Sequence, residues 1–340
     1  ASAQIVAKAA AVLGLEETRQ NYQAIADRQW QVVKEEYFTA TGRCAVKTQT
    51  GLVLALKYHL SDNERLTEQM LRKLLRDNKN KLNTGFVGTP LLCNVLTEHG
   101  MTDLAYRLLL NEEYPGWLHE VKLGATTVWE RWNSLDENGR ISSTGMNSLN
   151  HYSYGAVLEW IFRHVAGIDV TEQGPGGKMM RISPKVDHKL GSASAVYDSA
   201  SGCYRCGWQI ENGDQITVTI TVPFGAKAQV ILPYAPDSVY HDTDNPLFET
   251  VENGICCVKA GQYTVTYKAA SPLKKSYSVD STLEDLLAEP AIRAFLSNMM
   301  EVDMIPDLAY GLTLRQAAEA FAGGVSAEQA QRLNVLLEEF

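Results

Sequence analysis

Two neighbouring stretches are the most informative part of this sequence: Gly124-Ala-Thr-Thr-Val-Trp-Glu-Arg-Trp-Asn133 and Gly145-Met-Asn-Ser-Leu-Asn-His-Tyr-Ser-Tyr154. The first places one carboxylate, Glu130, between two tryptophans, Trp129 and Trp132, and the second carries a histidine 21 residues after that carboxylate. Aromatic rings bind the apolar C–H faces of a pyranose, and a carboxylate beside them can move a proton or activate a water. The pattern is therefore typical of a pocket that binds and cleaves sugars.

A structural role for the same residues is also open. We expect Glu130 near the start of a helix, where the helix dipole favours its negative charge. On such a helix the two indole rings can belong to the core, and the carboxylate can pair with Arg131 or with a distant lysine. Residue types alone do not separate the two interpretations.

Further segments upstream extend the pattern in order along the chain. Together they resemble the bacterial α-L-rhamnosidases, and the resemblance runs from about the start of the chain to about residue 270. It implies an inverting glycoside hydrolase with an (α/α)6 barrel followed by a β-sandwich. The segments are Gly85-Phe-Val-Gly-Thr-Pro90, Thr102-Asp-Leu-Ala-Tyr-Arg-Leu-Leu-Leu110, Tyr114-Pro-Gly-Trp117 and the two stretches above.

The resemblance also implies a role for each residue of the pocket. Glu130 matches the general base that activates a water, and His151 matches a histidine that contacts the sugar hydroxyls. Trp132 and Trp129 are candidates for the apolar floor, and Phe86 belongs to a glycine-flanked loop at the barrel mouth. A buried histidine satisfied by the backbone, or a tryptophan that faces the helix core, remains an alternative.

Two other polar positions are weaker candidates. Gln49, in Thr48-Gln-Thr50, is equally compatible with a binding and a structural role. The pair His119-Glu120 does not form a zinc motif, because Leu123 stands where a second histidine is needed. We expect no metal and no cofactor.

The general acid is missing from the pattern. In the resembled family it lies upstream of this region, in a motif of the Asp-Cys-Pro-Gln-Arg-Asp-Glu type, and nothing like it occurs here. We therefore expect the C-terminal fragment of a larger enzyme, with the base but not the acid, inactive on its own. An incomplete toroid exposes an apolar inner face, so a homo-oligomer is also expected.

Three regions follow one another along the chain. Residues 1–168 have apolar residues near a 3.6-residue period and short glycine-marked loops, which predicts helices, too few for a complete toroid. Residues 169–272 alternate with a period of two, which predicts an antiparallel β-sandwich. Residues 273–340 predict a small helical appendage, where Ser326-Ala-Glu-Gln329 has the form of a capping box.

The composition of the chain limits the classes of partner that we expect it to bind. The 340 residues carry a formal net charge of −9, with a pI near 5.4, which argues against nucleic acid and anionic membranes. No apolar run approaches the roughly 20 residues that span a bilayer. The six cysteines have no partner pattern for a metal or disulfide framework, and free thiols slightly favour a cytoplasmic location.

The expected partner is a rhamnose-containing oligosaccharide or glycoside. Two alternatives stay open: a non-catalytic carbohydrate-binding or scaffold protein on the same fold, and an α/α-toroid hydrolase that acts on another sugar.

Overall fold

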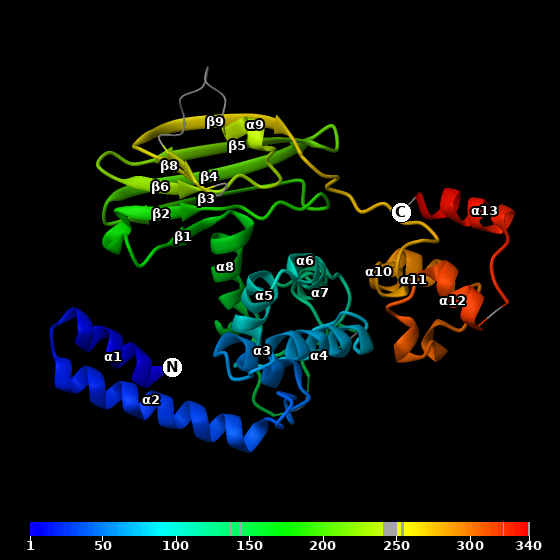
Figure 1. Cartoon of the computed structure of the whole chain (residues 1–340), viewed down its shortest axis with the longest axis horizontal. Helices are drawn as coiled ribbons and strands as arrows, with labels where there is room; N and C mark the ends of the chain where they lie inside the picture. The colour runs from blue at the N-terminus through cyan, green and yellow to red at the C-terminus, as the bar shows by residue number, and fades with distance from the viewer. Residues whose placement is uncertain (137, 143–144, 241–249, 253–254, 322, 339–340) are drawn as a thin grey trace. The chain divides into compact units, whose positions relative to one another are not determined.

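Helices with local start signals make up the first part of the chain (Figure 1). The Thr48 hydroxyl accepts a hydrogen bond from the Gly51 N–H at the start of α3, and the Asn63 side chain accepts one from the Leu66 N–H at the start of α4. Pro90 lies in the first turn of α5. The helical segments are α1 (Ser2–Val12), α2 (Glu16–Tyr37), α3 (Gln49–Lys57), α4 (Glu64–Asp77), α5 (Thr89–Glu98), α6 (Thr102–Leu109), α7 (Trp117–Lys122), η1 (Ser153–Ala156), α8 (Val157–Trp160) and η2 (Ile161–Val165).

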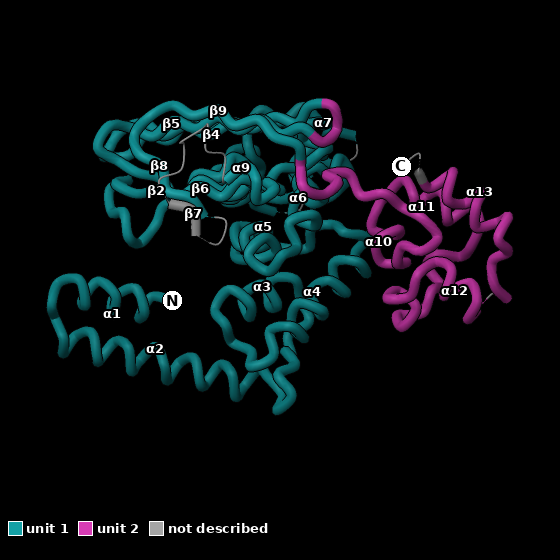
Figure 2. The backbone as a smooth tube through the Cα atoms, turned by 45° about the horizontal axis from the view of Figure 1, so that its top comes forward, with its two compact units in different colours: residues 1–211, 215–268 teal, residues 212–214, 269–340 magenta. Residues whose placement is uncertain are grey.

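The computed structural model describes residues 1–136, 138–142, 145–240, 250–252, 255–321 and 323–338. The chain divides into two units (Figure 2), one of residues 1–211 and 215–268, the other of residues 212–214 and 269–340. In the part of the chain that is described, no helix combines the length and the apolar character needed to cross a bilayer.

The helices of the first unit differ in how much they bury. Helices α3 to α6 share a core of fully buried leucines, whereas the pair α1 and α2 buries only alanines and exposes large apolar side chains. The buried leucines are Leu52, Leu56, Leu71, Leu75, Leu92, Leu96 and Leu108; the exposed side chains of α1, α2 and the turn between them include Ile5, Val12, Leu13, Leu15, Ile25 and Val32.

Two β-sheets follow the helices in the same unit. The first has the order β1-β2-β6-β8-β7 and the second β3-β4-β5-β9, with side chains alternating between buried and exposed along β5. This confirms the predicted change to a period of two. The pair β2 and β6 is parallel, whereas the other pairs are antiparallel. The strands are β1 (Ile168–Val170), β2 (Met179–Ile182), β3 (Ser192–Ser199), β4 (Gly202–Glu211), β5 (Gln215–Val222), β6 (Lys227–Val230), β7 (Thr250–Glu252), β8 (Ile255–Val258) and β9 (Gly261–Lys268).

Hydrogen bonds attach the β-sandwich region to the helices. The Trp208 indole N–H donates to the Val165 carbonyl at 2.7 Å, and the Tyr106 hydroxyl donates to the Lys185 carbonyl. All six cysteines are free thiols; Cys206 is buried and Cys203 is half-buried. These hydrogen bonds join the helices to the β-sandwich, and both regions belong to one compact unit.

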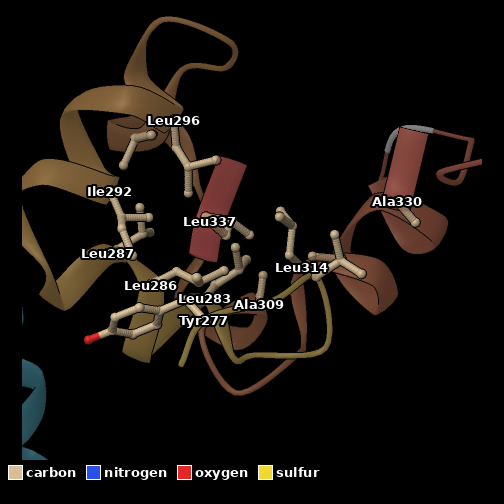
Figure 3. Close-up of a cluster of buried hydrophobic side chains, with 13 residues drawn as sticks. Tyr277, Leu283, Leu286, Leu287, Ile292, Leu296, Ala309, Leu314, Ala330 and Leu337 are labelled. Carbon is tan, nitrogen blue, oxygen red and sulfur yellow. The ribbon is translucent and has the colours of Figure 1, made fainter. Parts of the chain in front are cut away.

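The second unit is a small helical bundle with its own core (Figure 3). The Ser326 hydroxyl accepts from the Gln329 N–H (3.2 Å), and the Gln329 side chain accepts from the Ser326 N–H (2.9 Å), so the predicted capping box is present. Its helices are α10 (Leu283–Ala288), α11 (Pro290–Ser297), α12 (Leu314–Phe321) and α13 (Ala327–Glu338).

Candidate active site

Residues 124–154 fold back on themselves between α7 and α8. Two backbone hydrogen bonds join the two arms: the Glu130 N–H donates to the Ser148 carbonyl at 2.9 Å, and the His151 N–H donates to the Val128 carbonyl at 2.8 Å. The expectation that Glu130 begins a helix is therefore wrong, because its N–H is bonded to the opposite arm. The pairing brings half-buried Glu130 and half-buried His151 into one place.

An aromatic cluster lies behind this pair of arms. The Trp132 ring stacks on Tyr154 with centroids 4.0 Å apart, and Trp117 meets Trp132 edge to face at 5.4 Å. The Trp132 indole N–H donates to the Thr84 carbonyl at 3.0 Å. Both predicted tryptophans, Trp129 and Trp132, are buried. Tyr154 in turn meets the exposed Phe86 ring edge to face at 5.7 Å, so the buried cluster packs against an exposed ring.

His151 stacks with two aromatic rings. Its imidazole stacks with the ring of Phe86 (centroids 4.9 Å apart, interplanar angle 12°) and with the ring of Tyr152 (5.1 Å, 14°). The Ser153 N–H donates to His151 Nδ1 at 3.3 Å, so the neutral ring carries its proton on Nε2. Phe86 is 46% exposed and Tyr152 85% exposed. The stack therefore presents two apolar rings and one N–H donor at the surface.

The loop that carries Phe86 is held by α3. The Gln49 side chain donates to the Lys81 carbonyl (2.9 Å) and accepts from the Asn83 N–H (2.8 Å). A Cβ on Gly88 would lie 2.3 Å from a threonine hydroxyl oxygen of α3, so only glycine fits there. Gln49 is buried and both of its polar groups are used, which gives it a structural role.

A second carboxyl, Glu120, lies beneath the Glu130 arm. It is only 3% exposed, and burial raises its pKa to about 7, while a hydrogen bond from the backbone of Trp129 acts in the opposite direction. Its Oε1 has no hydrogen-bond partner among the described residues. Burial, followed by the charge of Glu120, also raises the pKa of Tyr154. The sequence offered no sign of this residue beyond the rejected zinc motif, because its burial depends on how residues 124–154 fold.

The arrangement suits acid–base chemistry on a polyhydroxylated ligand. A half-buried carboxylate can accept a proton from water, the His151 N–H can donate to a hydroxyl, and the rings of Phe86 and Tyr152 offer apolar faces. Among the described residues, no three of the His, Cys, Asp and Glu side chains gather in a way that could hold a metal ion. The structure brings together Glu130, His151 and Phe86 of the predicted site; Tyr152 and Tyr154 were predicted only as members of the motif.

Comparison with known proteins gives the family. Residues 1–165 match the bacterial α-L-rhamnosidase six-hairpin glycosidase domain, and residues 167–245 match the bacterial α-L-rhamnosidase C-terminal domain. An α-L-rhamnosidase of Formosa agariphila is 36% identical over 255 residues, which are 74% of this chain and 27% of that protein. One from Alteromonas sp. is 35% identical over 77% of this chain and 28% of its own length. The chain therefore spans little more than a quarter of these relatives.

Solved structures agree. The α-L-rhamnosidase of Streptomyces avermitilis, complexed with L-rhamnose, superposes with a TM-score of 0.71 at 32% identity, over 78% of this chain and 26% of that one. The native enzyme of Aspergillus terreus gives a TM-score of 0.70 at 28% identity, over 78% of this chain and 29% of that one. These matches confirm the predicted fold, toroid helices followed by a β-sandwich. The chain belongs to the family of bacterial α-L-rhamnosidases.

Proposed function

We propose that this chain supplies the general-base part of an α-L-rhamnosidase active site, and that the complete enzyme hydrolyses terminal α-L-rhamnosides with inversion. In this reaction Glu130 takes a proton from a water as the water's oxygen attacks the anomeric carbon. The bond to the leaving oxygen breaks on the opposite face, and a general acid protonates that oxygen. The observation that carries the proposal is the position of half-buried Glu130, fixed by its backbone beside the His151 stack in a chain of this family.

The neighbours of Glu130 have complementary roles in this proposal. The Nε2–H of His151 donates to a rhamnose hydroxyl, and Phe86 covers an apolar face of the sugar. Trp132, which stacks on Tyr154, and Trp129, which is also buried, are the proposed apolar floor of the pocket. A free imidazole would rotate, and stacking with Phe86 and Tyr152 restricts that rotation before the ligand binds.

The 340 residues are proposed to lack the general acid and to be inactive alone. The chain spans 25–28% of three curated relatives, and its sequence has no motif of the acid type. The exposed apolar side chains of α1 and α2 are the proposed surface for further helices or for a second copy of the chain. Size-exclusion chromatography with light scattering decides whether a second copy binds there.

Incubation of the 340-residue chain with p-nitrophenyl α-L-rhamnoside tests the missing acid. We expect no release of p-nitrophenol above that of a Glu130→Gln variant, because positioned proton transfer is worth about 10²–10⁴-fold. Release by the chain that Glu130→Gln abolishes contradicts the proposal of an inactive fragment. Parallel assays with p-nitrophenyl glucosides and mannosides test one of the alternatives: cleavage of one of these instead of the rhamnoside indicates a hydrolase for another sugar. If the complete enzyme binds L-rhamnose but hydrolyses no rhamnoside, the protein is a carbohydrate-binding protein.

A further inference from the structure

We propose that Ser134 and Asn147 are positioning residues for Glu130: together they form a clip that fixes the backbone on both sides of the candidate base. The inference rests on the proposed function for its effect on catalysis, since only there does Glu130 act as a base. The fixing of the backbone can be tested without any activity.

The clip joins the two arms of residues 124–154. The Ser134 hydroxyl donates to the Asn147 side-chain oxygen at 2.7 Å, and the Asn147 side-chain amide donates back to the Ser134 carbonyl at 2.9 Å. Because a carbonyl can only accept, the nitrogen of the Asn147 amide must be the atom that faces it. The two residues are thus joined by a reciprocal pair of hydrogen bonds that admits one orientation of the amide.

The peptide groups on both sides of the Glu130 Cα atom are held by this part of the structure. The Glu130 N–H donates at 2.9 Å to the carbonyl of Ser148, the residue that follows Asn147. The Arg131 N–H, on the other side of the Cα atom, donates to Ser134 Oγ at 3.1 Å. Since peptide groups are planar, fixing these two groups fixes φ and ψ of Glu130, and with them the direction in which its side chain leaves the backbone.

Each polar group of Ser134 takes part in this arrangement. The residue is fully buried, its N–H donates to the Arg131 carbonyl at 3.1 Å, and its carbonyl also accepts from the Ser142 N–H at 2.9 Å. An alanine at this position would remove the partner of the Arg131 N–H and of the Asn147 oxygen. A buried polar group without a partner destabilises the conformation to which it belongs, and here that conformation is the one that presents Glu130.

Amide hydrogen exchange of the 340-residue chain, followed by NMR, tests the clip directly. In Ser134→Ala we expect the amides of Glu130 and Arg131 to exchange about tenfold faster, because local opening becomes easier when a hydrogen bond is lost. Asn147→Ala should also accelerate the Glu130 amide. The amides of α3 and α5 are internal references. The matched control, Asn138→Ala in an exposed turn of the same segment, should leave both amides within about threefold of wild type.

Two further variants separate a hydrogen-bonded clip from side chains that only fill space. Asn147→Asp keeps the size of the side chain but places an oxygen against the Ser134 carbonyl, so it should accelerate the Glu130 amide at least as much as Asn147→Ala. In the double variant of Ser134→Ala and Asn147→Ala, the acceleration should fall short of the product of the two single effects, because both changes break the same bond.

Three outcomes overturn the proposal: unchanged exchange at Glu130 in both alanine variants, an Asn147→Asp variant that behaves as wild type, or single effects that multiply fully in the double variant. If Ser134→Ala does not fold, the two Asn147 variants decide alone, since that position is half-buried and tolerates change more readily.

A second measurement connects the clip to catalysis. In the complete enzyme proposed above, Ser134→Ala should lower kcat about tenfold or more and leave KM within about twofold of wild type, because a misaligned base weakens the transition state more than it weakens binding. Asn138→Ala should leave both constants unchanged. Faster exchange at Glu130 without a fall in kcat, or a change in KM alone, refutes the positioning role. If Glu130→Gln leaves hydrolysis intact, the proposed function fails, while the exchange results for the clip stand by themselves.

Discussion

Residues 124–154 and the C-terminal helical unit are stabilised in opposite ways. The C-terminal unit joins short capped helices around a closed apolar core, with the box of Ser326 and Gln329 at the start of α13. Residues 124–154 rely on hydrogen bonds between distant positions and bury an acid, Glu120, that has an unpartnered oxygen. The C-terminal unit is therefore organised for stability, whereas residues 124–154 accept an energetic cost to hold exposed groups in place.

The largest expected effect is at Glu130. In the complete enzyme proposed above, Glu130→Gln should lower kcat by about 10²–10⁴-fold, or about 3–5 kcal/mol in the activation barrier, because the amide cannot accept the proton. Thermal unfolding should change little, since the side chain is half-buried and the backbone bonds remain. Glu112→Gln, which removes an exposed partner of Lys122, is the matched control and should keep full activity. If Glu130→Gln instead unfolds at a temperature low enough to explain the lost activity, Glu130 stabilises the fold and the contrast between the two regions is wrong.

A substitution in the core of the C-terminal unit should affect stability. Leu286→Ala should lower the free energy of unfolding of that unit by about 2–5 kcal/mol, because Leu286 is fully buried (Figure 3). Urea denaturation followed by circular dichroism measures the change. Leu308→Ala, at an exposed site of the same unit, should cost less than 1 kcal/mol. Equal losses for the two leucines contradict a closed core in this unit.

The buried acid gives residues 124–154 a pH dependence. The folded pKa of Glu120, about 7, lies above its ordinary value of 4.5, so the folded chain keeps a proton that the unfolded chain releases between these pH values. The free energy of unfolding should therefore fall as pH rises from 4.5 to 7, by at most about 3 kcal/mol from this group. Denaturation at pH 5 and pH 8 measures the difference, which Glu120→Gln should remove and Glu112→Gln should not. A wild-type difference that persists in Glu120→Gln assigns it to other groups.

The capping box of α13 should contribute the smallest of these effects. Ser326→Ala removes one side of the capping box and should destabilise the C-terminal unit by about 1 kcal/mol. Gln331→Ala, at an exposed position within α13, is the control and should be nearly neutral or slightly stabilising. Thermal unfolding of the two variants measures this change. Equal melting temperatures would mean that the capping box makes no measurable contribution to the stability of the C-terminal unit.

Much of the fold was predictable because its signals are local. Alternation along Gln215–Val222 predicted a strand, and the Ser326 box predicted a helix start, since both depend on residues a few positions apart. The antiparallel arrangement was predicted with one exception, the parallel pair of β2 and β6, whose partners are distant in sequence. The pairing of strands that are distant in sequence cannot be predicted from local sequence patterns.

The candidate site was predictable in its residue types but not in its geometry. The motif predicted Glu130, His151 and Phe86 as neighbours, but a helix was expected where the Glu130 N–H bonds to Ser148. Glu120 was missed, because a carboxyl in a short polar-looking helix carries no sign of burial until the loop folds over it. Such long-range backbone pairing is invisible to periodicity.

In the proposed reaction, Glu130 activates the attacking water. The most direct test of this role is proton NMR of the sugar first released from an α-L-rhamnoside by the complete enzyme proposed above, with wild type and Glu130→Gln compared at equal concentration. We predict that wild type releases β-L-rhamnose before mutarotation and that the variant releases product at least about 10²-fold more slowly. Release of the α-anomer first, or an unchanged rate in Glu130→Gln, would contradict the account.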